Sequence, residues 1–206
     1  MFRLRTPLTI ACAMALPLLV AAGAAWPQPA AVPGASPGAS PGASPDDPAF
    51  GRLTDADCTG VRGGRPLAYR NPRYGFGMTY PSCFTLDPES VPENGDSARF
   101  WTADRQATAA VMGQPNRAGQ SIADLLREAR QDILENSRGT VTYERARDNW
   151  FVVSGFVGGR IYYQRTFLTA GGRVVGTLWI EFPRAMRPCL EAAVTLMSIS
   201  FRQAGP

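Results

Sequence analysis

The sequence predicts an α+β domain in which an antiparallel sheet of six to seven strands, mostly a meander, is flanked by two helices. Three observations support this prediction. Four strand-like runs follow one another between residues 140 and 182, joined by very short turns. Turns this short join antiparallel neighbours, because a parallel return needs a crossover of about a dozen residues or more. One amphipathic helix precedes these runs, and a second follows them.

Residues 1–25 have the features of a secretory signal peptide. They contain a basic start (Arg3 and Arg5), an apolar stretch (Leu8–Val20) and a small-residue cleavage site (Ala22–Ala24). The alternative is a transmembrane anchor, but Pro17 interrupts the stretch, and a spanning helix needs about 20 apolar residues. We therefore expect export, cleavage and no integral membrane span afterwards.

Residues 26–48 form a predicted disordered linker rich in Pro, Gly, Ala and Ser. The unit Pro33-Gly34-Ala35-Ser36 is repeated through Ser44, so the segment has little apolar surface to bury. Regular prolines keep such a spacer extended. Residues 49–68 are expected to be an irregular extension, and residues 69–203 the globular domain.

Three strands are expected at the start of the domain. Tyr74, Phe76, Met78 and Tyr80 alternate with small or polar residues until Pro81, as in a half-buried strand. The runs 98–102 and 107–112 flank the polar turn Asp104-Arg105 and predict a hairpin.

The first helix is predicted to begin after Ser121. Asp124 lies three residues beyond this N-cap, as in a capping box, and apolar residues recur at helical spacing through Ile133. Gly139 is expected to end the helix. The second helix is predicted over 188–198, with Pro188 in its first turn.

The four runs of the meander are predicted at 140–146, 150–157, 160–169 and 173–182. Asp148-Asn149, Gly158-Gly159 and Gly171-Gly172 lie between them and suit tight hairpins. The run Trp150–Val153 is apolar at every position, which indicates cover on both faces of the sheet.

The segment Tyr69–Phe76 followed by Tyr80-Pro81 resembles the opening of the Mog1/PsbP-like superfamily, which includes DcrB-type exported bacterial proteins. The helix, the long meander and the closing helix ending at Ser200-Phe201 are similar to that layout too. The resemblance covers residues 69–202. It implies an accessory or binding protein, as are photosystem assembly factors and a GTPase-binding protein of this fold, and it brings no catalytic residues with it.

The composition removes most catalytic mechanisms. The chain has no histidine and no lysine, so it has no histidine-activated nucleophile, no Schiff base and no phosphate-binding lysine. We expect no catalytic residue, no metal and no cofactor. The alternative is a small hydrolase using paired carboxylates, drawn from Asp87, Glu89, Glu93, Asp96, Glu144 and Glu181.

The charge does not indicate a nucleic-acid partner. The leader holds two of the 21 arginines and no acid, so the remaining chain carries 19 arginines against 17 acids. A net charge of +2 produces no long-range field that would attract nucleic acid.

One strand carries a candidate partner contact. Arg160, Tyr162 and Gln164 share a face of the run 160–169, and Arg165 interrupts the opposite face beside Tyr163. Either Arg160 lies at a solvated edge and Arg165 has a carboxylate partner, or Arg and Tyr form a patch for an anionic or protein ligand.

Cys58, Cys83 and Cys189 follow the leader, and export favours one disulfide with one thiol left over. Cys58 with Cys83 is expected, because it would attach the extension to the domain; Cys83 with Cys189 is the alternative.

Together these features predict a periplasmic or secreted, monomeric, non-catalytic binding or accessory protein of the bacterial cell envelope, with an unknown envelope protein or an anionic ligand as partner. A third alternative is a purely structural protein in which the linker 26–48 is the working part.

Overall fold

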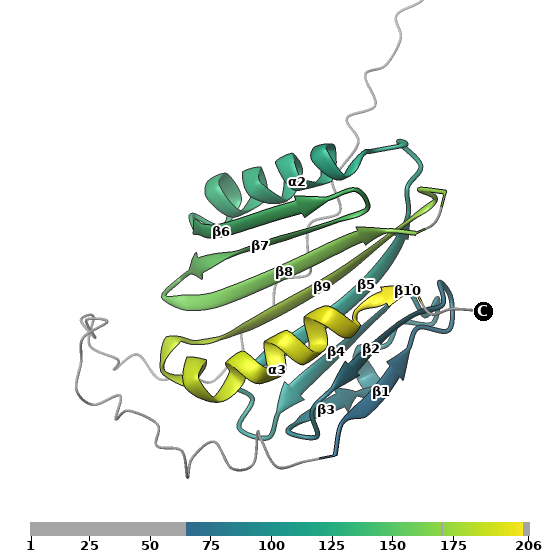
Figure 1. The fold of residues 1–206 in the computed structure, drawn as a ribbon. Helices are drawn as coiled ribbons and strands as arrows, with labels where there is room; N and C mark the ends of the chain where they lie inside the picture. The colour runs from purple at the N-terminus through teal and green to yellow at the C-terminus, as the bar shows by residue number, and fades with distance from the viewer. Residues whose placement is uncertain (1–64, 170, 204–206) are drawn as a thin grey trace, which may run out of the picture. The chain divides into compact units, whose positions relative to one another are not determined.

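The computed structural model describes residues 65–169 and 171–203, and the predicted fold class is confirmed. A seven-stranded antiparallel sheet has the order β3-β4-β5-β9-β8-β7-β6, and a three-stranded sheet has the order β1-β2-β10 (Figure 1). The predicted signal peptide 1–25, the linker 26–48 and residues 49–64 of the extension lie outside the described residues.

The predicted meander forms one half of the large sheet. Its strands are β6 (Thr140–Arg147), β7 (Trp150–Val157), β8 (Arg160–Leu168) and β9 (Val174–Pro183), each antiparallel to the next. Gly158 and Gly159 have φ values of 54° and 80°, so this turn requires the left-handed region that glycine tolerates. The predicted hairpin is also present, as β4 (Ser97–Thr102) and β5 (Thr108–Pro115).

The first predicted strand belongs to the smaller sheet instead. β2 (Phe76–Tyr80) pairs with β1 (Leu67–Arg70) and with the two-residue β10 (Arg202–Gln203). The outer position beside β4 is taken by β3 (Phe84–Asp87). Periodicity identifies a strand but not its partners, and a four-residue strand after a proline turn is too short to show a pattern.

The helix α2 (Ile122–Gln131) begins with the predicted capping box. Ser121 Oγ accepts the backbone N–H of Asp124, and the Asp124 carboxylate accepts the N–H of Ser121. The helix continues into a π-helical turn over Asp132–Asn136, and the left-handed residue beyond it is Arg138, with φ 50°. Gly139, the predicted stop, follows directly and donates its N–H to the Ile133 carbonyl at 2.8 Å. A Cβ at this position would lie 2.7 Å from Val157 and 2.8 Å from the Phe156 carbonyl, so the close approach of β7 also requires glycine.

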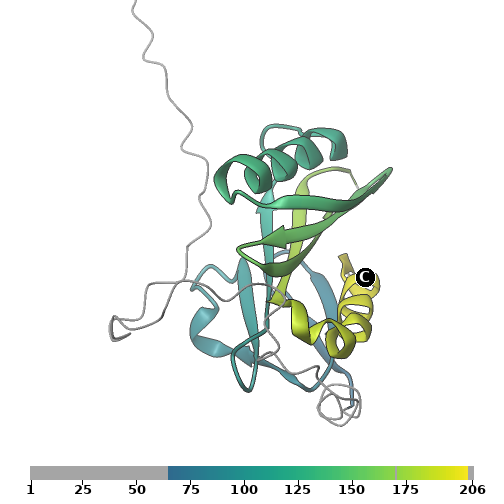
Figure 2. The ribbon, with the colours of Figure 1, turned by 90° about the vertical axis from the view of Figure 1, so that its left-hand side faces the viewer.

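The two helices cover opposite faces of the large sheet (Figure 2). Ile122 and Leu125 of α2 pack in one cluster with Phe151 of β7. Leu190 and Met197 of α3 (Arg187–Ser200) pack in a second cluster on the other face, which also contains residues of the small sheet. Between Pro183 and α3, residues Arg184–Met186 form a short 3₁₀ turn. None of the helices in the described part of the chain is long and apolar enough to cross a membrane.

Candidate functional site

Tyr162, the central residue of the predicted contact, is a core residue. It lies on the α2 side of β8 and is 0% exposed. Its ring stacks on that of Trp179, with centroids 5.1 Å apart and an interplanar angle of 7°. Its hydroxyl donates to the Thr140 carbonyl at 3.3 Å, and burial raises its pKa to about 12. Tyr162 therefore offers no surface to a partner.

The neighbours of Tyr162 on this face have hydrogen-bond partners within the domain. Arg160 is ion-paired with Glu181 and also donates to the Gln106 carbonyl. Gln164 donates to the Thr166 hydroxyl at 3.2 Å. The expected patch of Arg160, Tyr162 and Gln164 thus shares a face as predicted, but each member has a partner within the domain.

The opposite face of the same strands is built differently. Residues paired across antiparallel strands share a face, so the register gives three rows on the α3 side. The rows are Tyr143–Ser154–Tyr163, Arg145–Val152–Arg165 and Arg147–Trp150–Phe167, each running from β6 through β7 to β8.

Arg165 and Trp150 form the centre of this face. The guanidinium carbon of Arg165 lies 4.4 Å from the centre of the Trp150 ring, and that of Arg145 lies 5.9 Å from the same ring. Within the described residues Arg165 makes no ion pair, and its buried Nε has no hydrogen-bond partner. Burial lowers the pKa of Arg165, since it disfavours the charged form. The sequence suggested a carboxylate partner for Arg165, and no such partner is present among the described residues.

Two tyrosines adjoin this cluster. The hydroxyl groups of Tyr163 and Ser198 are hydrogen-bonded at 2.6 Å, which joins β8 to α3. Burial raises the pKa of Tyr163, and the positive charge of Arg165 opposes that rise. Tyr143 is 49% exposed on β6. The face therefore combines exposed aromatic surface with positive charge.

A groove of about 440 Å³ lies between β6–β8 and α3 on this side. Its lining includes Phe156, Ile161 and Phe182 from the sheet, Tyr143 from β6, and Arg187 and Glu191 from α3. Arg187 and Glu191 are 3.9 Å apart and both exposed. The guanidinium carbon of Arg184 lies 3.8 Å from the centre of the Phe156 ring. We call this groove, together with Trp150, Arg145 and Arg165, the α3-side groove.

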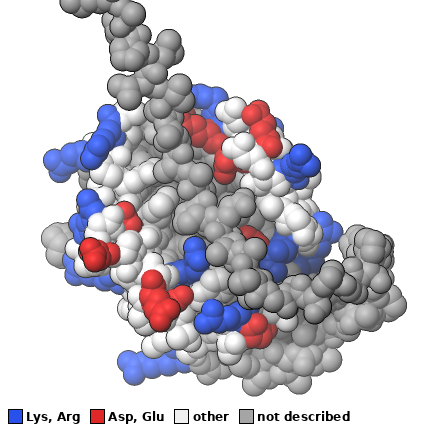
Figure 3. Space-filling model, turned by 180° about the vertical axis from the view of Figure 1, so that it is seen from behind, with Lys and Arg blue, Asp and Glu red and all other residues white. Residues whose placement is uncertain are grey.

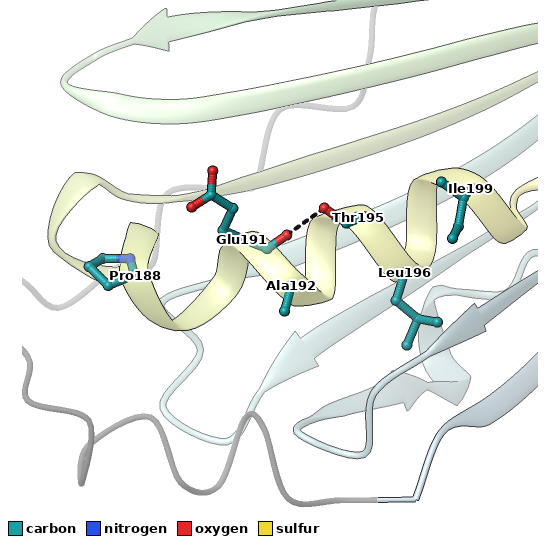
Figure 4. Close-up of a pocket in the computed structure, with 6 residues that line it drawn as sticks. All are labelled: Pro188, Glu191, Ala192, Thr195, Leu196 and Ile199. Atoms are coloured by element: carbon teal, nitrogen blue, oxygen red, sulfur yellow. Dashed lines mark hydrogen bonds between the residues drawn. The ribbon is translucent and has the colours of Figure 1, made fainter.

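A second hollow lies on the outer side of α3 (Figure 4). It is formed mainly by Pro188, Ala192, Leu196 and Ile199, and Ile199 is 67% exposed. The Thr195 hydroxyl in it already donates to the Glu191 carbonyl at 2.9 Å. Its apolar surface lacks the directed polar groups that specify a small ligand.

Four of the six carboxylates considered for hydrolysis have partners in the domain. Asp87 accepts the backbone N–H of Glu89, and Asp96 accepts the Asn94 side chain. Glu144 is paired with Arg130 and Glu181 with Arg160. Of the six, none lines the α3-side groove, whose acidic lining residue is Glu191. Over the described ranges, no cluster of three or more acidic or cysteine side chains could hold a metal ion.

The view from behind shows the face opposite α3 (Figure 3). On its visible described surface, basic and acidic side chains are interspersed and no region of one sign dominates. Arg99 and Trp101 alternate along β4 with Ala98 and Phe100 of the α3-side core cluster, so they lie on the opposite face. The guanidinium carbons of Arg99 and Arg105 are 5.7 and 5.8 Å from the centre of the Trp101 ring, and Trp101 also donates to Asp87 at 3.3 Å. A carboxylate is thus already present beside this second arginine–tryptophan group.

The cysteines are arranged differently from the expectation. Cys83 is a free, half-buried thiol, which is at variance with the expected Cys58–Cys83 pairing, and burial raises its pKa. Cys189 is disulfide-bonded and almost fully buried in α3. Cys58 lies outside the described residues. Cys83 packs against the larger core cluster, so it needs no bond to be fixed.

Comparison with known proteins identifies the fold. No protein-family model and no curated protein matches the sequence. Among solved structures, the cyanobacterial PsbP of Synechocystis sp. PCC 6803 matches with a TM-score of 0.54 and 14% identity, over 70% of this chain and 96% of that one. The Saccharomyces cerevisiae Ran-binding protein Mog1p matches with a TM-score of 0.54 and 8% identity, over 68% and 96%. A mutant of the protein Mog1 matches with a TM-score of 0.51 and 10% identity, over 68% and 96%.

Proposed function

We propose that this chain, which has the Mog1/PsbP-like fold, is an exported, non-catalytic binding or accessory protein of the bacterial cell envelope, and that it binds its partner in the α3-side groove. The observation that carries the proposal is Arg165: a half-buried guanidinium stacked on Trp150, with no ion-pair partner in the described part of the chain. Burying a charge costs free energy unless the charge is paired. A site that contains an unpaired buried charge therefore gains binding free energy when a ligand supplies the counter-charge.

Export is supported by the sequence alone. The basic start, the apolar stretch and the small-residue cleavage site of residues 1–25 are typical of a leader, and the repeats up to Ser44 are typical of a spacer.

A binding role is supported by the chemistry of the groove. Arginine and aromatic residues are the types most enriched where proteins bind one another, and both occur on this face. The hydrolase alternative requires two carboxylates facing one substrate. In the α3-side groove Glu191 stands beside Arg187 rather than beside a second carboxylate, so this site favours binding.

The test is photo-crosslinking in the bacterium that carries the gene. A photoreactive residue replaces Tyr143 on the rim of the groove, and in a control it replaces Arg127, which is exposed on α2. We expect a defined adduct in the envelope fraction from position 143, lost when Arg165→Gln is added, and none from position 127. Equal adducts from both positions, or a chain retained in the cytoplasm, would contradict the proposal.

A further inference from the structure

We infer that the α3-side groove binds an extended acidic segment of a partner protein, with acidic residues at both ends of the segment and apolar residues between them. This inference rests on the proposed function and names the class of partner.

The positive charges of the groove lie at its two ends. At one end Arg165 and Arg145 flank the ring of Trp150, where β7 begins; at the other, Arg184 lies on the ring of Phe156, near the end of β7. A strand advances about 3.3 Å per residue, so the two rings are about 20 Å apart along β7. A small anion would reach one end, whereas an extended peptide of about six or seven residues spans both.

Acidic residues are scarce on this side of the sheet. The register places Arg145, Arg147 and Arg165 on it, and Arg184 and Arg187 border the groove from the α3 side. Glu191 is the acidic residue in the groove lining, and it already faces Arg187. Asp148 lies in the turn beyond Arg147. A complementary ligand therefore carries negative charge, which arginine binds best as a carboxylate held by two parallel hydrogen bonds.

Between its two ends the groove is mainly aromatic. The register places the row Tyr143–Ser154–Tyr163 there. The apolar row Phe156–Ile161–Phe182 lies at the Arg184 end and contributes to the floor. The Tyr163 hydroxyl is already bonded to Ser198, so it presents its ring rather than a free polar group. This surface suits the apolar side chains of an extended segment, whose alternate residues point toward the groove.

The test uses the purified chain, with its disulfide intact, and synthetic peptides. A fluorescent peptide of about ten residues has glutamates at both ends and leucine and valine between them; in its matched partner every glutamate is glutamine. Fluorescence anisotropy is measured with the unaltered chain, with Arg165→Gln and Arg145→Gln, and with Arg99→Gln as control. Arg99 also lies over a tryptophan, but the alternation along β4 places it on the other face of the sheet. Circular dichroism confirms that each variant is folded.

We expect the glutamate peptide to bind at least about tenfold more tightly than the glutamine peptide. Arg165→Gln and Arg145→Gln each weaken binding several-fold, Arg99→Gln leaves it unchanged, and added salt weakens it. Equal binding of the two peptides, or no effect of Arg165→Gln and Arg145→Gln, overturns the inference. So does binding to vesicles of anionic lipid that exceeds binding to the peptide, because the partner is then a membrane surface.

Failure of this inference is distinguishable from failure of the proposed function. If position 143 still crosslinks a defined partner while the acidic peptide does not bind, the groove is a binding site and only the class of ligand is wrong. If neither occurs, the proposed binding face is wrong as well.

Discussion

The guanidinium of Arg165 lies over Trp150, with its central carbon 4.4 Å from the ring centre, at the point where β8 faces β7. The contact offsets part of the cost of burying a charge, since the face of an indole attracts cations. It does not replace a counter-ion, and the buried Nε of Arg165 stays without a hydrogen-bond acceptor among the described residues. We interpret Arg165 as a residue that serves the binding of a partner rather than the stability of the domain.

Replacing Arg165 with methionine is therefore expected to leave the free energy of unfolding unchanged or to raise it by about 1 kcal/mol, because an unpaired, half-buried charge is removed while the packing volume is kept. Urea denaturation measures this. Glu181→Gln is the comparison: it breaks the ion pair with Arg160 and should lower stability by about 1 kcal/mol. A loss larger for Arg165→Met than for Glu181→Gln would show that Arg165 is structural.

Tyr162→Ala should destabilise the domain by about 3–5 kcal/mol, because it removes a fully buried ring that stacks on Trp179 beneath α2. Tyr162→Phe should cost no more than about 1 kcal/mol, since the hydroxyl makes one long hydrogen bond, at 3.3 Å. Denaturation midpoints of the two variants give the comparison. A Tyr162→Ala variant as stable as the unaltered chain would show that Tyr162 is not a core residue and is free to contact a partner.

The capping box gives a pH-dependent contribution to stability. Hydrogen bonds from Ser121 and Arg127 lower the pKa of Asp124 from 3.8 to about 2. Because the folded pKa is depressed, this contribution is complete above about pH 4 and is lost as the pH falls toward about 2. Ser121→Ala should cost about 1 kcal/mol at neutral pH and remove part of this acid dependence. Thermal unfolding across the acid range tests it; an unchanged acid profile would assign the dependence to other carboxylates.

The cysteines give a prediction that needs no mutation. Without reductant, iodoacetamide should modify Cys83 slowly in the folded chain and rapidly after unfolding, because burial and a raised pKa both limit its thiolate. Peptides containing Cys189 should be modified only after reduction. Peptide mass spectrometry measures both. Modification of Cys189 in the unreduced chain would contradict the disulfide.

The meander and both helices were predictable because local signals specify them: two-glycine turns, a Ser-x-x-Asp cap, and apolar residues at helical or alternating spacing. The pairing of β2 with β10 was not predictable, since it joins residues more than 100 positions apart, such as Phe76 and Gln203. Nothing local in Phe76–Tyr80 distinguishes an inner strand of a small sheet from an edge strand of a large one.

The contact predicted from the sequence and the proposed groove lie on opposite faces of β8. Arginine and tyrosine on this strand indicated a binding surface, yet both faces carry them, and the sequence does not show which face each helix covers. A further signal lies in β6 and β7: Tyr143, Arg145 and Arg147 alternate, and Trp150 begins the next strand. Whether Arg165 has an ion-pair partner depends on where carboxylates from distant parts of the sequence lie in space. Only the structure shows that, within the described residues, none pairs with it.

The most direct test of the account follows the arginine Nε–Hε signals by NMR while the acidic peptide is titrated into the purified chain. We expect the signals of Arg165 and Arg145 to shift together and to saturate, while that of Arg99, on the opposite face, stays in place. Shifts spread evenly over all arginines, or a shift of Arg99 with Arg165 unmoved, would show that the α3-side groove is not where the partner binds.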